Sequence, residues 1–198
     1  MRKYFLLAFI IAMSFDAISQ EDNAPTKEEV NEFFNTKTFV VQDPNPISRY
    51  NIELKEAVKD NWNITDYEII KYEEFEEKRR NPDYSFLMED ILVFEKDKTK
   101  ARYRFLSLLK GDKVRRIEEM PAICAIPLSY REVDEKFWAY KLGVIIRFMQ
   151  QHVKTIKDKP EILEEGLFEN NILEYYHKNL EDIKDKTLYL IKEELAEE

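Results

Sequence analysis

Two long segments that suit β-strands, the second of them alternating, constrain the fold of this chain most strongly. They are YSFLMEDILVFEK, residues 84–96, and ARYRFLSLLKGDKV, residues 101–114, and the hydrophilic stretch DKTK separates them. In the second segment, Tyr103, Phe105 and Ser107 alternate with two arginines and a leucine, so one face of it is partly polar. A strand buried on both faces is continuously apolar, whereas a half-exposed strand alternates. The two segments therefore predict an antiparallel β-hairpin.

The first half of the chain alternates short β-type runs with helical spacing. KTFVVQ, residues 37–42, and YEII, residues 67–70, are short apolar runs rich in β-branched and aromatic residues, so we expect strands there. Between them, a helix is expected to begin at Ile47 or Ser48 and to end at Asn63. Its apolar stripe follows i, i+4, i+7 and i+8 spacing and consists of Tyr50, Leu54, Ala57, Val58 and Trp62.

The stretch YEEFEEKRRN, residues 72–81, places aromatic residues among charges. Such a stretch could be an aromatic surface that grips a ligand, or a short helix with one solvated charged face. Tyr72 and Phe75 are three residues apart and share one helical face, while the charged residues face water. We therefore interpret it as a helix between two strands.

The remaining segments complete the fold prediction. AICAIPL, residues 122–128, is almost continuously apolar and predicts a central strand. Wide apolar stripes predict helices over residues 134–157 and 164–182, and residues 187–191 again look like a strand. We expect an α/β fold with a mixed β-sheet of five or six strands covered by helices, with a long C-terminal helical pair. Residues 37–198 would form a single domain, or the N-terminal part of a longer protein.

The N-terminus has the order of features found in an export signal. Arg2 and Lys3 precede an apolar run, and small residues at Ala17 and Ser19 fit a signal-peptidase site that would leave Gln20 as the new N-terminus. The alternative is a buried helix. Residues 1–19 are thus predicted to be a signal peptide, and residues 20–36 a flexible lead-in with room for one helical turn at its end.

The same features predict where the protein resides. The apolar run of the signal is short for a membrane span, and no later segment is apolar enough to cross a bilayer. We expect an exported protein that is soluble after signal cleavage, located in the periplasm, associated with the outer membrane, or extracellular. The formal net charge of -9 argues against nucleic acid as a partner, because an acidic chain repels phosphate.

Several classes of chemistry lack their residues here. The glycines are Gly111, Gly143 and Gly166, which cannot form the glycine-rich loops of Rossmann enzymes or P-loop NTPases, so no cofactor is expected. Cys124 lies in an apolar strand, where a thiol is usually inert. With His152 and His177 as the only histidines, neither a cysteine–histidine pair nor a zinc site is indicated. We therefore predict no catalytic residues and no metal site.

The stretch VVQDPNPISRYN, residues 40–51, is the best candidate for a binding site. In open α/β sheets, ligands lie beyond the carboxyl ends of strands, beside the N-terminus of the following helix. Asp43, Asn45, Ser48 and Arg49 would lie there if the first strand is inside the sheet. The alternative is a stiff strand-to-helix connection in which Ser48 is the N-cap.

Four short motifs carry a resemblance to known proteins. They are Thr38–Val41, Trp62–Glu68, Glu74–Glu76 and Tyr84–Leu87. With these motifs the chain resembles a group of exported bacterial proteins of uncharacterised function, over residues 37–90. The resemblance implies export but no activity. The expected element order is also similar to that of small α/β domains of envelope assembly proteins, such as the N-terminal domain of TolB and the CsgG-like secretion proteins.

These observations favour a non-enzymatic binding or assembly module of the bacterial cell envelope, whose partner would be a protein or a small ligand there. Two alternatives stay open. One is a hydrolase that uses some of the many carboxylates of the chain. The other is the first lobe of a two-domain ligand-binding protein.

Overall fold

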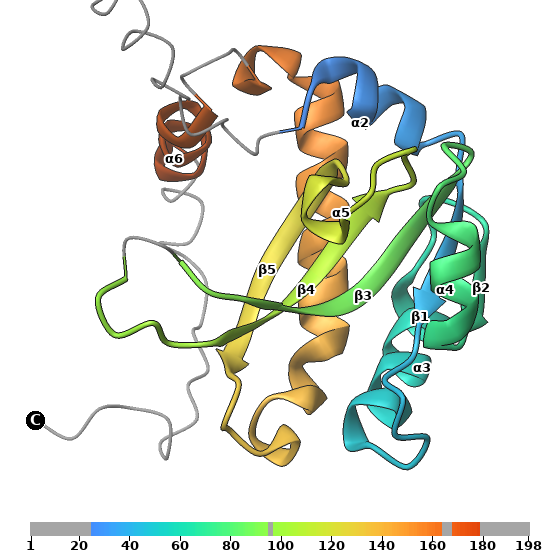
Figure 1. Ribbon diagram of the computed structural model, residues 1–198. Helices are drawn as coiled ribbons and strands as arrows, with labels where there is room; N and C mark the ends of the chain where they lie inside the picture. The colour runs from blue at the N-terminus through green and yellow to red at the C-terminus, as the bar shows by residue number, and fades with distance from the viewer. Residues whose placement is uncertain (1–24, 95–96, 164–167, 179–198) are drawn as a thin grey trace, which may run out of the picture.

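The computed structural model describes residues 25–94, 97–163 and 168–178. It contains a five-stranded mixed sheet with the strand order β2-β1-β3-β4-β5 (Figure 1). The strands are β1 (Lys37–Val41), β2 (Tyr67–Ile70), β3 (Tyr84–Leu92), β4 (Tyr103–Lys110) and β5 (Ala122–Tyr130). The α-helices are α2 (Lys27–Phe33), α3 (Arg49–Asn61), α4 (Tyr72–Lys78), α5 (Leu142–Asp158) and α6 (Phe168–Lys178). The predicted α/β class, with a sheet of five or six strands, is confirmed.

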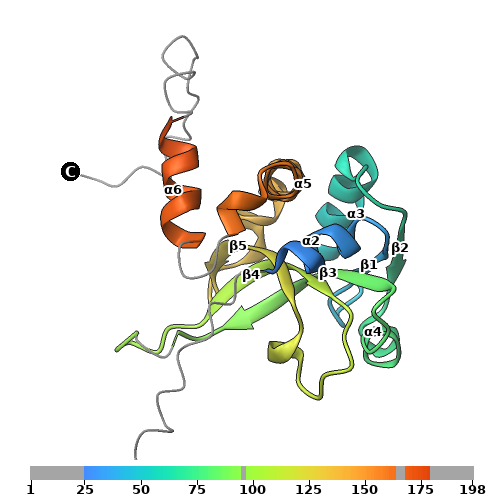
Figure 2. The ribbon, with the colours of Figure 1, turned by 90° about the horizontal axis from the view of Figure 1, so that it is seen from above.

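Helices cover the two faces of the sheet unequally. Helices α2, α3 and α5 lie on one side, and α4 lies on the other (Figure 1, Figure 2). The larger core cluster lies between α3, α5 and the sheet, and includes Tyr50, Leu54, Leu87 and Leu106. The smaller cluster lies on the α4 side and is built around three phenylalanines and two methionines. These phenylalanines and methionines are Phe39, Phe75, Phe86, Met88 and Met120.

The predicted hairpin is the antiparallel half of the sheet. Leu87 of β3 lies opposite Leu108 of β4, and Glu89 lies opposite Leu106. Strand β1 pairs in parallel with β2 on one side and with β3 on the other. The first strand is therefore inside the sheet, as the candidate binding site requires. Strand β3 continues past the end of β1 toward the hairpin.

The prediction that residues 122–128 form a central strand is wrong. Strand β5 is an edge strand, and it continues to Tyr130. Its apolar sequence has a different cause, because Ile123 and Cys124 pack into the larger cluster while Ala125 and Pro127 are exposed on the other face. A proline, which lacks a backbone N–H, is tolerated at a sheet edge.

Part of the predicted flexible lead-in is an ordered helix. In α2, Thr26 accepts a hydrogen bond from the Glu29 amide, and the Glu29 carboxylate accepts one from the Thr26 amide, which forms a capping box. Val30 and Phe33 of this helix are buried. The prediction had room for one helical turn at the end of residues 20–36, and the structure has a helix of seven residues there, docked by these two apolar side chains.

The C-terminal helices differ from the prediction in their bounds. Residues 135–137 and 139–141 form 3-10 turns, and the α-helix begins only at Leu142. Helix α6 covers Phe168–Lys178 of the predicted residues 164–182, and the other residues of that prediction lie outside those that the structure describes. The expected strand at 187–191 and the expected signal peptide at 1–19 lie outside the described residues. Within those that are described, no helix is long and apolar enough to span a bilayer.

Candidate functional site

The connection between β1 and α3 is held by its own polar side chains. Asp43 Oδ1 accepts a hydrogen bond from the Asn45 amide at 2.7 Å. The buried Asn51 side chain accepts a hydrogen bond from the Asp43 amide through Oδ1 at 2.8 Å. Its Nδ2 atom donates to the carbonyl oxygens of Asp43 and Asn45 at 3.0 and 2.8 Å. Ser48 Oγ accepts from the Asn51 amide at 3.1 Å and caps α3, as predicted. Asp43 and Ser48 thus shape the loop, and the stiff connection exists.

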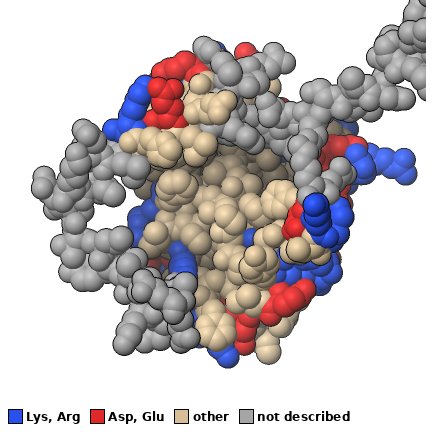
Figure 3. All heavy atoms as spheres, turned by 90° about the vertical axis from the view of Figure 1, so that its left-hand side faces the viewer, with Lys and Arg blue, Asp and Glu red and all other residues tan. Residues whose placement is uncertain are grey.

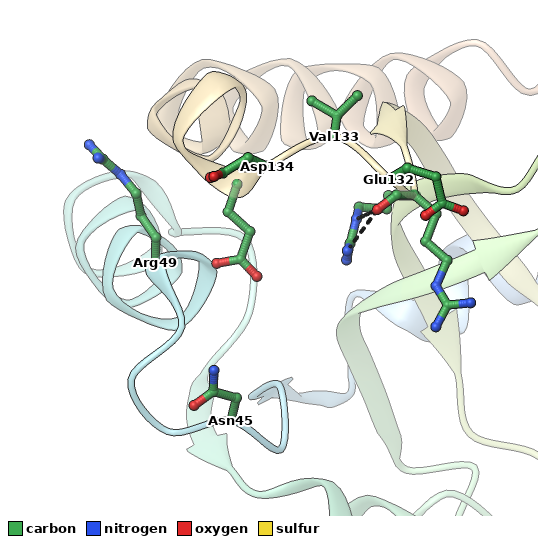
Figure 4. Close-up of a pocket in the computed structure, with 8 residues that line it drawn as sticks. Asn45, Arg49, Glu132, Val133 and Asp134 are labelled. Atoms are coloured by element: carbon green, nitrogen blue, oxygen red, sulfur yellow. Dashed lines mark hydrogen bonds between the residues drawn. The ribbon is translucent and has the colours of Figure 1, made fainter.

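Asn45 and Arg49, by contrast, line an open hollow of about 760 Å³. Its opposite wall is the loop that follows β5, residues 131–135, and Arg104 of β4 also lines it. Figure 4 shows Asn45 on one side, and Glu132, Val133 and Asp134 on the other. Of the four predicted site residues, the structure thus brings two to one concave surface beyond the end of β1.

The sequence reasoning missed the second wall entirely. Residues 131–135 are far from residues 43–49 along the chain, and only the fold joins the two segments. One signal was present in the sequence. Arg104 shares its sheet face with Leu106 and Leu108, which are core residues, so a charge interrupts an apolar face.

Arg104 links the floor of the hollow to this wall. Its Nε and Nη2 atoms donate to the Arg131 carbonyl at 3.2 and 3.0 Å, which are the dashed lines in Figure 4. Its Nη1 atom forms an ion pair with the carboxylate of Glu89 on β3. The guanidinium also lies over the Trp138 ring, 5.7 Å from its centroid. A planar guanidinium can serve all these partners at once, so it fixes the position of the loop.

Glu89 is a carboxylate in a largely apolar setting. Burial raises its pKa above the usual value, the nearby charge of Arg104 acts in the opposite direction, and the carboxylates of Asp43 and Glu135 raise it further. Its Oε2 atom is buried and has no hydrogen-bond partner among the described residues. The same holds for Tyr50 Oη and Trp138 Nε1. Buried polar atoms of this kind are uncommon in folded proteins.

The carboxylates of the wall are held to different degrees. Glu135 Oε2 accepts a hydrogen bond from the Tyr50 amide at 2.9 Å, in the first turn of α3. Asp134 accepts from the Lys136 amide at 3.0 Å and pairs with the Lys136 ammonium at 3.4 Å. Glu132 and Glu135 form no ion pair with any described residue. The hollow therefore presents carboxylates beside arginines, which suits a small polar ligand.

The other candidate groups lie elsewhere and are structural. The Cys124 thiol is buried, and burial raises its pKa to about 12, so it stays protonated. His152 Nδ1 is 2.9 Å from Tyr176 Oη, in the contact between α5 and α6. The described part of the chain contains no cluster of three or more residues that could hold a metal ion.

A second hollow of about 730 Å³ lies at the start of β1 and β2, lined by Lys37 and residues 62–67. Next to it, buried hydroxyls form a chain. Thr65 Oγ1 is 2.6 Å from Thr38 Oγ1, which is 2.7 Å from Ser85 Oγ. Ser85 Oγ is in turn 2.8 Å from Thr36 Oγ1. Because neighbouring hydroxyls satisfy one another, this region is a structural tie between strands.

Comparison with known proteins leaves the site to be judged on its geometry, since no family model, curated protein or solved structure matches this chain.

Proposed function

We propose that this chain is an exported, non-enzymatic binding module of the bacterial cell envelope, which binds a small polar ligand in the hollow between the β1–α3 connection and residues 131–135. The observation that carries the proposal is the Glu89–Arg104 pair. It holds the wall of the hollow in place through the Arg131 carbonyl. A wall that is already fixed in the free protein reduces the entropic cost of ordering this loop when a ligand binds.

The position of the hollow supports the same function. It lies beyond the carboxyl end of β1, where ligands of open α/β sheets usually bind. Arginine, carboxylate and amide groups converge there, so a ligand with both charged and hydrogen-bonding groups would find partners. Export follows from the order of charged, apolar and small residues over 1–19.

A ligand screen tests the binding proposal. The chain, expressed from its full-length sequence, is heated with a panel of small polar metabolites, and a ligand that binds the folded state raises the unfolding temperature as its concentration exceeds the dissociation constant. We expect Arg131→Ala to remove the shift, whereas Arg80→Ala, an exposed arginine on the far side of the sheet, keeps it. A shift that persists in Arg131→Ala places the ligand elsewhere. Sequencing the secreted product tests export, with Gln20 as the expected N-terminus.

A hydrolase remains the second candidate because of one observation. Glu132 and Glu135 line the hollow without ion pairs to described residues, and the charge of Glu135 helps to raise the pKa of Glu89 beneath it. General acid–base chemistry uses a protonated and an ionised carboxyl in one site. Turnover of any substrate in a panel of glycosides, esters and peptides, abolished by Glu135→Gln and kept by Glu56→Gln, at an exposed position of α3, would favour this function.

The alternative of a first lobe rests on the open shape of the hollow, which a second lobe could close. It shares the ligand site with the main proposal and is tested by the same screen.

A further inference from the structure

One face of α5 carries apolar side chains that the described residues cover only in part. Four residues with i, i+1, i+4 and i+8 spacing lie on this face, which we call the α5 face: Val144, Ile145, Phe148 and His152. Val144 and Phe148 are 61% and 47% exposed. Ile145 is half-buried at the border of the larger core cluster. Apolar side chains gathered on one helix face usually pack against another element.

One end of the α5 face is in contact with α6. The Tyr176 ring of α6 lies 5.9 Å from the Phe148 ring and 6.2 Å from the His152 ring, and the Tyr176 hydroxyl is 2.9 Å from His152 Nδ1. Helix α6 ends at Lys178, so the chain continues from the helical turn that makes this contact. Figure 3 shows the side of the molecule that carries α6 and β5, where a wide uncharged area has charged residues at its rim. The exposed part of the α5 face, around Val144, thus lies one step beyond an established contact.

Helix α5 and the turns before it are basic. Residues 136–157 contain five lysines and arginines and neither Asp nor Glu, although the whole chain has a net charge of -9. Arg147 and Lys154 each donate to a neutral asparagine side chain, at 2.8 and 3.3 Å, so the described residues leave these two charges without a carboxylate. An occupant of the α5 face that matches it should therefore be acidic as well as apolar.

We propose that the α5 face is the docking site of residues 179–198 of the same chain, with the apolar stretch TLYLI, residues 187–191, placed over Val144. This segment contains seven acidic residues and three lysines, so its net charge is opposite to that of α5. The connection is long enough. Residues 179–186 can extend over roughly 26 Å, whereas His152 and Val144 are separated by about 12 Å along the helix axis.

Three other occupants fit the α5 face less well. A second copy would bring two basic α5 helices together about a two-fold axis, where like charges repel. An anionic bilayer would attract α5, but the net charge of -9 repels the molecule from it. An unrelated acidic protein has to compete with a segment that is tethered next to the face, and a short tether gives an effective concentration on the order of millimolar.

Amide exchange in the full-length chain tests the proposal. We expect the amides of residues 187–191 to exchange at least about tenfold more slowly in the wild type than in Val144→Glu, because the added carboxylate repels the acidic segment. Ile52→Glu is the matched control, since Ile52 is 55% exposed on α3, and this variant should keep the slow exchange. The proposal is overturned if these wild-type amides exchange as fast as those of an unfolded peptide, or if Val144→Glu leaves their exchange slow.

Disulfide trapping decides the matter if Val144→Glu disturbs folding, as judged by circular dichroism. Leu190→Cys is combined with Val144→Cys or, as the control, with Ile52→Cys; the native Cys124 is buried and its raised pKa of about 12 keeps it protonated. Docking predicts an intramolecular disulfide that forms at least about tenfold faster in the first pair. Equal rates in the two pairs, or a disulfide that joins two chains, would show that residues 179–198 do not cover the α5 face.

Vesicles test the bilayer as the occupant. The wild type is mixed with vesicles that contain phosphatidylglycerol, and we expect it to stay in solution. Binding to these vesicles that Val144→Glu abolishes and Ile52→Glu retains would assign the α5 face to a membrane surface and overturn the proposal.

Discussion

Gly111 follows the end of β4, at a point where two backbone segments touch. A methyl group at this position would overlap the carbonyl oxygen of Asn81 and would lie 3.0 Å from the carbonyl carbon of Asn81 and 3.1 Å from the carbonyl oxygen of Tyr84. These are backbone atoms, so no side chain can rotate away. Gly111→Ala must therefore push two backbone segments apart.

The magnitude follows from two contributions. Forcing a methyl group into a packed site typically costs about 1–3 kcal/mol. The Gly111 amide also donates to the Tyr84 carbonyl at 2.8 Å, and separating the segments weakens this hydrogen bond, which adds about 1 kcal/mol. We therefore expect Gly111→Ala to lower the free energy of unfolding by about 2–4 kcal/mol, a large share of the roughly 5–15 kcal/mol of a typical domain.

Gly143→Ala provides the control. Gly143 lies in the first turn of α5, and the atom nearest to an added methyl group would be Asn61 Nδ2 at 3.5 Å, an ordinary contact. Alanine favours helix more than glycine does, so the variant should gain about 0.5–1 kcal/mol. Urea unfolding of the wild type and both variants, followed by circular dichroism, measures the differences. The reasoning is refuted if Gly111→Ala is as stable as the wild type.

Three further predictions concern buried polar groups. Ser85→Ala removes the middle of the buried hydroxyl chain, and urea unfolding should show a loss of about 1–3 kcal/mol, with a neutral result contradicting the chain. Burial raises the pKa of Glu89, so the contribution of this carboxyl to stability is complete below about pH 4.5 and is lost as the pH rises through the raised pKa. The free energy of unfolding, measured from pH 4 to 8, should show this pH dependence in the wild type and not in Glu89→Gln. Burial lowers the pKa of His152 below 6.5, so the contribution of this side chain to stability is complete above that pH and is lost as the pH falls through the lowered pKa. His152→Phe should remove this acid sensitivity from the free energy of unfolding. In Tyr176→Phe, which loses the hydroxyl partner of His152, NMR should still show a His152 titration.

Local patterns explain why much of the fold was predictable. Residues 84–96 and 101–114 were predicted to pair as a hairpin, and the structure pairs Ser85–Leu92 with Tyr103–Lys110. The helical stripe from Tyr50 to Trp62 packs into the larger core cluster, with Ser48 as its N-cap. Strands, helices and helix caps depend on residues that are close in the sequence, so the pattern of a single sequence can predict them.

Strand order and the hollow depend on contacts between distant residues. The sequence of an apolar strand does not show whether the strand lies at the centre or at the edge of a sheet. Residues 122–128 therefore suggested a central strand, although β5 lies at the edge. Likewise, Asn45 and residues 131–135 meet only because β1 and β5 end near the same side of the molecule. Half of the candidate site was therefore visible in the sequence and half was not.

Variants of the largely buried pair of Glu89 and Arg104 can distinguish a preorganised binding site from a purely structural ion pair. Removing one charge of a buried pair leaves the other charge buried without a partner and lowers the free energy of unfolding by about 3–5 kcal/mol. Replacing both residues by apolar ones is often neutral or stabilising. We expect Glu89→Leu to be strongly destabilised in urea, and the double variant Glu89→Leu with Arg104→Met to recover to within about 1 kcal/mol of the wild type.

The recovered double variant would still lack the two hydrogen bonds that hold the Arg131 carbonyl. If the pair exists to place the wall of the hollow, the amides of residues 132–135 should exchange faster in the double variant than in the wild type, although both are equally stable. Arg80→Ala, at an exposed arginine on the far side of the sheet, should leave this exchange unchanged. Equal exchange rates in the double variant and the wild type would mean that the pair only fills the core, and the argument that it preorganises a ligand site would then fail.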